Sequence, residues 1–190
     1  MPIIGTINSA ISGRLYTALA AFNSIATISP TGTSATFSSI PATFSHLKII
    51  GLQQSNYTAY NITSGLQFNG DNTSSYYRSS WYNLGDGVGN QYAYKDGSSS
   101  MNLGAQITAG SYYAPSGWLS YEIDIPNYTA TDMYKSAHGT FVNGPLGISV
   151  SQMVLGSGVW KNTNAITSIT ITLSSGSFVS GSRLNLYGIL

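Results

Sequence analysis

The sequence predicts an all-β fold: an antiparallel two-sheet sandwich, by its strand number a jelly roll, with a short N-terminal arm or helix. Strong helix formers are scarce, because the 190 residues include one Glu and four Lys, while Ser, Thr, Tyr, Ile, Val and Phe dominate. About nine or ten short segments of alternating polarity are separated by turn signals. No helical segment lies between them, which excludes parallel βαβ units and leaves a sandwich or a closed barrel.

Residues 1–22 are the one stretch with a helical alternative. Leu15, Ala18, Leu19 and Phe22 recur at the spacing of one helical face. Such a short helix is marginal by itself. We therefore expect residues 1–22 to form an arm that packs on something else, and residues 23–190 to form the sandwich domain.

The strands follow in order along the domain. Residues 25–28 and 35–37 flank the turn Pro30-Thr31-Gly32 and predict a first hairpin. Further strands are expected at residues 44–53, 66–68, 76–82, 101–107, 117–125, 134–142, 148–160, 166–173 and 183–189. Residues 83–100 contain several Gly-Asp and Gly-Asn turn signals, and we expect a loop there. Turns are also expected at residues 156–158 and 181–182.

The strand at residues 117–125 has the clearest alternation. Trp118, Ser120, Glu122 and Asp124 are expected on one face, and Leu119, Tyr121, Ile123 and Ile125 on the other.

Composition excludes several classes of protein. Charged residues make up 7% of the chain and the net charge is +1, too little positive charge to bind nucleic acid. Cys is absent, so disulfides and thiolate metal sites are excluded. No apolar run reaches the roughly 18 residues of a membrane-spanning helix. The N-terminus also lacks the basic start and apolar core of a secretory signal, and no motif predicts a cofactor.

Candidate catalytic residues are few. His46 and His138 are the only histidines, and no G-x-S-x-G nucleophile elbow accompanies them, so we interpret both as structural. Glu122 and Asp124 are two residues apart on one strand face, roughly 6–7 Å between α-carbons, a spacing that suits a glycosidase pair. The polar face of any exposed strand has the same spacing, so the structural interpretation is favoured.

A partial calcium site is a further candidate. Asp71-Asn72 and the loop Gly85-Asp86-Gly87 offer oxygen ligands, but no complete D-x-[DN]-x-[DN]-G run is present. Asp beside Gly or Asn is also typical of ordinary turns. The sequence leaves calcium binding open and predicts no metal ligand.

Aromatic residues are concentrated between residues 76 and 118. Such side chains suit a hydrophobic core, a protein interface or a platform for sugar rings, and the sequence leaves these alternatives open. The candidates for contact with a partner or a glycan are Trp81, Tyr82, Tyr94, Tyr113 and Trp118.

Four segments resemble the β-rich virion structural proteins of tailed bacteriophages, especially marine and cyanobacterial phages. They are residues 36–51 (TFSSIP, then FSHLKIIG), 66–76 (LQFNGD, then SY), 160–173 (WKNTNAITSITITL) and 177–189 (SFVSGSRLNLYGI). Their order and spacing extend the resemblance over about residues 24–190. One departure is Gln67, where the family often has Arg.

The resemblance implies a non-enzymatic protein on the outer surface of a phage particle, with no catalytic residues. It would decorate or cement the capsid or form a head fibre, as a symmetric homo-oligomer such as a trimer, in contact with the major capsid protein or tail components. The N-terminal arm is then the natural anchor, through Ile3, Ile4, Leu15, Tyr16, Leu19 and Phe22. The alternative is a tail-fibre or receptor-binding module that binds host surface glycan.

Overall fold

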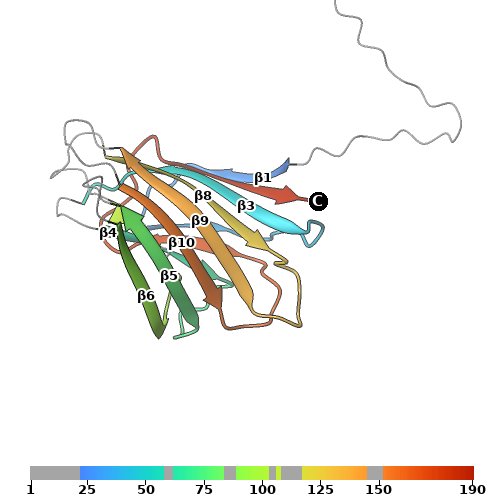
Figure 1. Ribbon diagram of the computed structural model, residues 1–190. Helices are drawn as coiled ribbons and strands as arrows, with labels where there is room; N and C mark the ends of the chain where they lie inside the picture. The colour runs from blue at the N-terminus through green and yellow to red at the C-terminus, as the bar shows by residue number, and fades with distance from the viewer. Residues whose placement is uncertain (1–21, 58–61, 84–88, 103–105, 108–116, 145–151) are drawn as a thin grey trace, which may run out of the picture.

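The computed structural model describes residues 22–57, 62–83, 89–102, 106–107, 117–144 and 152–190, and of residues 82–83, 89–96, 106–107, 144 and 152 only the backbone. The described chain is built from β-strands, and it contains no helix (Figure 1). Within these ranges no helix is long and apolar enough to cross a membrane.

The larger of two antiparallel sheets has eight strands (Figure 1). In spatial order they are β1 (Phe22–Ile28), β12 (Arg183–Ile189), β3 (His46–Gln53), β8 (Trp118–Pro126), β9 (Lys135–Gly144), β10 (Gln152–Trp160), β5 (Tyr76–Asn83) and β6 (Gly89–Ser98). The first and last strands of the domain, β1 and β12, therefore lie side by side.

The smaller sheet has four strands and covers one face of the larger one. Its spatial order is β2 (Ser34–Phe37), β11 (Ile169–Leu173), β4 (Ile62–Phe68) and the two-residue β7 (Gln106–Ile107). The inward side chains of both sheets form one buried cluster, including Phe37, Leu47, Ile49, Phe68 and Ile171. This confirms the predicted all-β, two-sheet antiparallel sandwich.

The connections cross repeatedly between the two sheets. If the β5–β6 and β9–β10 pairs are set aside, the remaining eight strands change sheet at every step except from β4 to β7, which both lie in the smaller sheet. The predicted hairpin of residues 25–28 and 35–37 is therefore wrong: β1 pairs with β12, and β2 pairs with β11. The turn after β1 carries the chain to the other sheet because the apolar sides of both strands must face the same core.

Alternation along β8 agrees with the sequence prediction. Leu119, Tyr121, Ile123 and Ile125 are buried, while Ser120 and Glu122 are exposed. The opposite face of the eight-stranded sheet, turned away from the four-stranded one, is hereafter the outer face.

Two local predictions are wrong. Residues 83–100, expected as a loop, contain β6, which pairs along β5 from Asn83↔Gly89 to Tyr76↔Ser98. Residues 156–158, expected as a turn within the predicted strand 148–160, lie in the middle of β10 and continue that strand. A Cβ at Gly158 would approach the Met101 side chain within 2.5–2.6 Å, so a core contact explains that glycine.

Candidate functional site

The predicted carboxylate pair lies on the outer face as part of an ion cluster. Lys48 Nζ is 3.0 Å from Glu122 Oε2 and 3.2 Å from Asp124 Oδ2. Burial by itself would lower the pKa of Lys48, but its hydrogen bonds to both carboxylates outweigh this effect and raise it. Both carboxylates share one ammonium on a sheet surface, which is the arrangement of a surface ion cluster.

The two histidines have separate surroundings. His46 Nδ1 accepts a hydrogen bond from the backbone N–H of Asn127 (3.3 Å), at the turn that follows β8. His138 is largely exposed on β9, with its Nε2 4.0 Å from Asp124 Oδ2. His46 thus supports a turn, while His138 faces the surface beside the ion cluster.

Asp71 joins two of the motif segments. Its Oδ1 accepts hydrogen bonds from the backbone N–H and hydroxyl of Thr73 (2.9 and 2.6 Å), and its Oδ2 accepts one from Trp160 Nε1 (2.7 Å). These donors, the Thr73 hydroxyl first and the Trp160 indole next, hold the pKa of Asp71 below its usual range. Both carboxylate oxygens therefore have structural partners.

The suggested calcium site gains no support from this geometry. No group of three or more His, Asp or Glu side chains that could hold a metal occurs in the described part of the chain. Asp86 lies outside the described residues.

The residues around Asp71 form what we call the motif cluster: Phe68, Asn69, Asp71, Tyr76 and Trp160. The Tyr76 hydroxyl accepts from Phe68 N–H (2.8 Å) and lies 3.0 Å from the Asp71 carbonyl, to which it donates. The rings of Tyr76 and Trp160 are stacked, with centroids 6.3 Å apart. Asn69 Oδ1 accepts from the N–H groups of Thr167 and Ser168. Through these contacts the motif cluster connects β4 with β5 and β10.

Gln67, the departure from the family pattern, has a partner of its own. Its Nε2 donates a hydrogen bond to the Ser99 carbonyl (2.8 Å).

Lys135 is a buried cation that the sequence does not single out. Its ammonium donates to the carbonyls of Met133 (2.9 Å) and Thr163 (3.0 Å), joining the loops next to β9 and β10. Burial lowers the pKa of Lys135, and the nearby Asp132 offsets part of this effect. With two carbonyl partners and 1% of its surface exposed, this lysine serves to hold the loops together.

The aromatic residues predicted to contact a partner or a glycan differ in their exposure. Trp81 is exposed on the outer face, and Trp118 is half-buried on the same face beside Gly181. The side chains of Tyr82 and Tyr94, and the whole of Tyr113, lie outside the described residues.

Of the predicted anchor residues, only Phe22 lies within the described part of the chain. Ile3, Ile4, Leu15, Tyr16 and Leu19 lie outside the described residues. Phe22 is the first residue of β1, is 52% exposed, and meets the Tyr187 ring edge-on.

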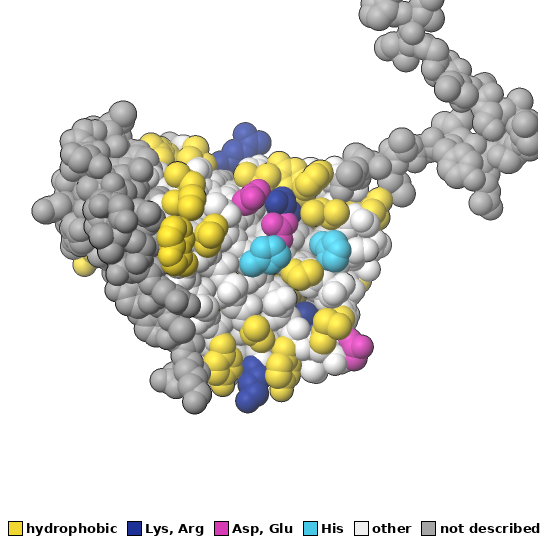
Figure 2. All heavy atoms as spheres, in the orientation of Figure 1, with side chains coloured by type: hydrophobic (Ala, Val, Ile, Leu, Met, Phe, Trp, Pro, Cys, Tyr) yellow, Lys and Arg dark blue, Asp and Glu magenta, His cyan; other side chains and the backbone are white. Residues whose placement is uncertain are grey.

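Four exposed apolar side chains adjoin one another on the outer face, and we call them the apolar patch: Trp81, Val142, Met153 and Leu155. Val142 pairs with Met153 between β9 and β10, and Leu155 pairs with Trp81 between β10 and β5. Each has 37–46% of its surface exposed. Figure 2 shows this face, on which hydrophobic side chains gather beside uncharged polar surface. Sequence patterning missed the patch because its members are brought together only by strand pairing.

A groove of about 380 Å³ lies on strands β5, β9 and β10. Its lining has six outward side chains, which define the serine groove: Tyr77, Ser79, Ser136, His138, Ser157 and Val159. Ser157 pairs with Ser79 on one side and with His138 on the other. Three serines from three strands thus meet on one surface, which only the sheet register reveals.

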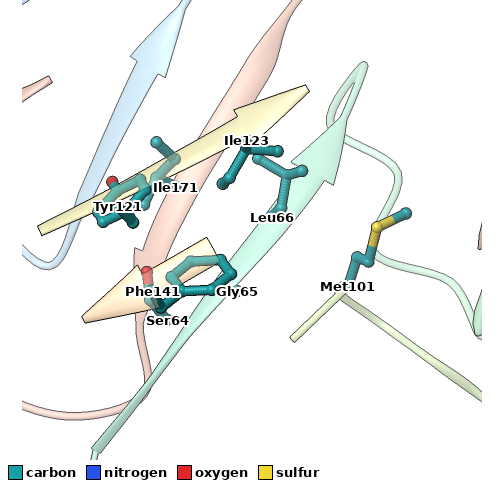
Figure 3. A pocket seen from close by; sticks show the side chains of 8 residues that line it. All are labelled: Ser64, Gly65, Leu66, Met101, Tyr121, Ile123, Phe141 and Ile171. Carbon is teal, nitrogen blue, oxygen red and sulfur yellow. The ribbon is translucent and has the colours of Figure 1, made fainter. Parts of the chain in front are cut away.

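An interior cavity lies between the two sheets (Figure 3). Its volume is about 10 Å³, and residues such as Leu66, Tyr121 and Phe141 line it. This is about the space that a single water needs, and the lining is largely apolar. The cavity is a small packing gap in the core, too small for a ligand.

No protein-family model matches this chain, and no curated protein matches it either.

Proposed function

We propose that this protein is a non-enzymatic structural component on the outer surface of a tailed-phage particle. It decorates or cements the capsid or forms a head fibre, and residues 1–22 anchor it to the capsid or tail. The four motif segments support this proposal by their resemblance to phage virion proteins. The observation that carries it is the apolar patch, exposed on a molecule with very little charge.

The apolar patch suits contact with a second copy of the chain. Contiguous exposed apolar side chains are uncommon on monomers and mark interaction surfaces. Only 7% of the residues are charged, so copies packed side by side repel one another little. Such contacts are also insensitive to salt, since they do not depend on ion pairs. We propose a closed symmetric homo-oligomer, for which a trimer would suit a fibre.

The motif cluster supports a structural interpretation of the resemblance. Phe68 and Trp160 are buried and pack at a centroid distance of 5.6 Å, and Asp71 uses both carboxylate oxygens to hold its neighbours. Residues of this kind specify a fold. What the chain shares with phage proteins is therefore the framework of the sandwich, in line with a role in assembly.

We also propose that the sandwich is a jelly roll with two inserted strand pairs. Without those two pairs, the remaining eight strands have the spatial orders β1-β12-β3-β8 and β2-β11-β4-β7. A jelly roll likewise has eight strands in two sheets, and many viral capsid proteins use it. The pairs β5–β6 and β9–β10 widen one sheet and carry the apolar patch and the serine groove.

The test is the oligomeric state of the Leu155→Asp variant. Leu155 is 46% exposed, so a charge there leaves folding intact but opposes burial in an interface. By light scattering after gel filtration, the wild-type protein is expected to be an oligomer and the variant a monomer.

The matched control for this test is Ser24→Asp, exposed on β1 at the other end of the eight-stranded sheet from the patch, which should remain an oligomer. A monomeric wild-type protein, or a variant that still assembles, contradicts the assembly proposal. A cryo-EM map of the virion then tests the location of the protein.

A further inference from the structure

The serine groove has the dimensions and the lining of a ligand site. Its volume of about 380 Å³ falls within the usual range of small-molecule sites. The row Ser79–Ser157–His138 crosses three adjacent strands, which places polar groups at steps of roughly 4.8 Å. Ser136 and Val159 form the next row, with Tyr77 beside Val159.

The hydroxyl groups of the groove are available to a ligand. Ser79, Ser136 and Ser157 have no hydrogen-bond partner for their hydroxyls among the residues that the structure describes. Each hydroxyl offers one donor and two acceptor sites, and the His138 imidazole adds a donor and an acceptor. The groove therefore matches a ligand that both donates and accepts hydrogen bonds along its length.

The strands beneath the groove have no free edge on which a peptide could pair as an additional strand. β10 is paired on both sides, by β9 and by β5, and β9 is paired by β8 and β10. Their backbone groups are occupied in the sheet, so a peptide cannot extend the sheet there. Recognition in the groove must depend on side chains.

The charges around the groove do not favour an anion. Arg78 contributes to the lining, but alternation along β5 places it on the face of Tyr76, where its guanidinium donates to the Asn102 carbonyl (3.4 Å). The ammonium of Lys48 is held by Glu122 and Asp124. The outward lining otherwise consists of hydroxyl, imidazole and aromatic groups and the aliphatic side chain of Val159.

We propose that the serine groove binds a neutral carbohydrate chain, with Tyr77 against the apolar face of a sugar ring and the serines and His138 bonded to its hydroxyls. An aromatic plate beside uncharged polar groups suits a sugar, which has both apolar C–H faces and hydroxyl edges. This site adds a ligand to the outer face and does not depend on the assignment to a phage particle.

The test measures binding of four neutral hexasaccharides to the full-length protein by calorimetry and saturation-transfer NMR. The probes are maltohexaose, cellohexaose, laminarihexaose and mannohexaose, with hexagalacturonate as the charged comparator. At least one neutral probe is expected to bind, and more tightly than hexagalacturonate. If no neutral probe binds at millimolar concentration, or if hexagalacturonate binds more tightly, the proposal is overturned.

Two variants locate the site. Tyr77→Ala is expected to weaken binding about tenfold through the lost ring contact. Ser157→Trp fills the groove from an exposed position and is expected to abolish binding, whereas the matched control Ser120→Trp on the same face keeps it. Unchanged binding by Ser157→Trp overturns the location.

Oligomeric state separates this proposal from the assembly proposal. The Leu155→Asp variant is expected to bind the same sugar as the wild-type protein, because Leu155 does not line the groove. If Ser157→Trp instead disrupts an oligomer that binds no sugar, the groove is an interface between copies and the carbohydrate proposal fails.

Discussion

Single residues of the motif cluster connect segments that are far apart in the chain. Asp71 and Trp160 are 89 positions apart and share a hydrogen bond of 2.7 Å. Charge-assisted hydrogen bonds of this kind are stronger than neutral ones. A residue that resembles a metal ligand in the sequence therefore serves to close the sandwich.

Replacement of Asp71 by Asn should lower stability and change its dependence on pH. The loss of charge-assisted bonds to Thr73 and Trp160 is expected to reduce the free energy of unfolding by about 1–3 kcal/mol near neutral pH. Because the pKa of Asp71 is lowered in the folded protein, its contribution is present above the pKa of the unfolded chain. It is lost as pH falls through the folded value.

Urea unfolding of wild-type and Asp71→Asn protein, over the range from about pH 5 to pH 2, measures this difference. The stabilities of the two proteins should converge toward the acid end. A constant difference across this range would show that the Asp71 charge is not the cause.

At the scale of elements, aromatic rings packed over glycines join neighbouring strands. Gly51 on β3 pairs with Tyr121 on β8, and a Cβ at Gly51 would overlap the Tyr121 ring. A Cβ at Gly188 on β12 would likewise overlap the ring of Phe44, which lies just before β3. Because glycine has no side chain, the two rings can pack directly against the backbone of the sheet. In β10, Gly158 leaves room for the Met101 side chain in the same way.

The change Gly51→Val is expected to destabilise the sandwich by about 2 kcal/mol or more, because the Tyr121 ring cannot keep its place. That ring is buried and its hydroxyl donates to Gln53 Oε1 (2.9 Å), so its displacement also breaks a buried hydrogen bond. Thermal unfolding followed by circular dichroism measures the effect.

The neighbouring change Ile50→Val is the control for Gly51→Val. Ile50 is exposed on the outer face, so this change should alter stability by no more than about 0.5 kcal/mol. Equal losses in both variants would contradict the role of the Tyr121 ring.

At the scale of the whole molecule, the first and last described strands of the sandwich pair with each other. β1 begins at Phe22 and pairs with β12 from Phe22↔Ile189 to Ile28↔Leu184. The described pairing uses no residue before Phe22, which is compatible with the proposed role of residues 1–21 in anchoring.

Deletion of residues 1–21 is expected to leave the domain folded and soluble but to abolish its incorporation into phage particles. The pairing of β1 with β12 is retained, while the anchor is lost. Mass spectrometry of purified particles measures incorporation, and the melting temperature of the purified variant checks folding. Normal incorporation of the variant would refute the anchor.

Much of the fold could be predicted from the sequence because alternation is a local property. The inward and outward faces of β8 follow directly from the alternation of residues 118–125. β6 was missed because the turn signals of residues 83–100 outweighed its two tyrosines. The first hairpin was predicted wrongly because a turn signal does not specify in which sheet the next strand lies.

The fold class, the strand faces and the low charge can be predicted from residue type and short-range spacing alone. Which residues meet is visible only in the folded molecule: Asp71 with Trp160, the two carboxylates with Lys48, and the serines of three strands in one groove. These contacts depend on strand pairing, which joins segments far apart in the chain. Their register depends on packing of the whole core.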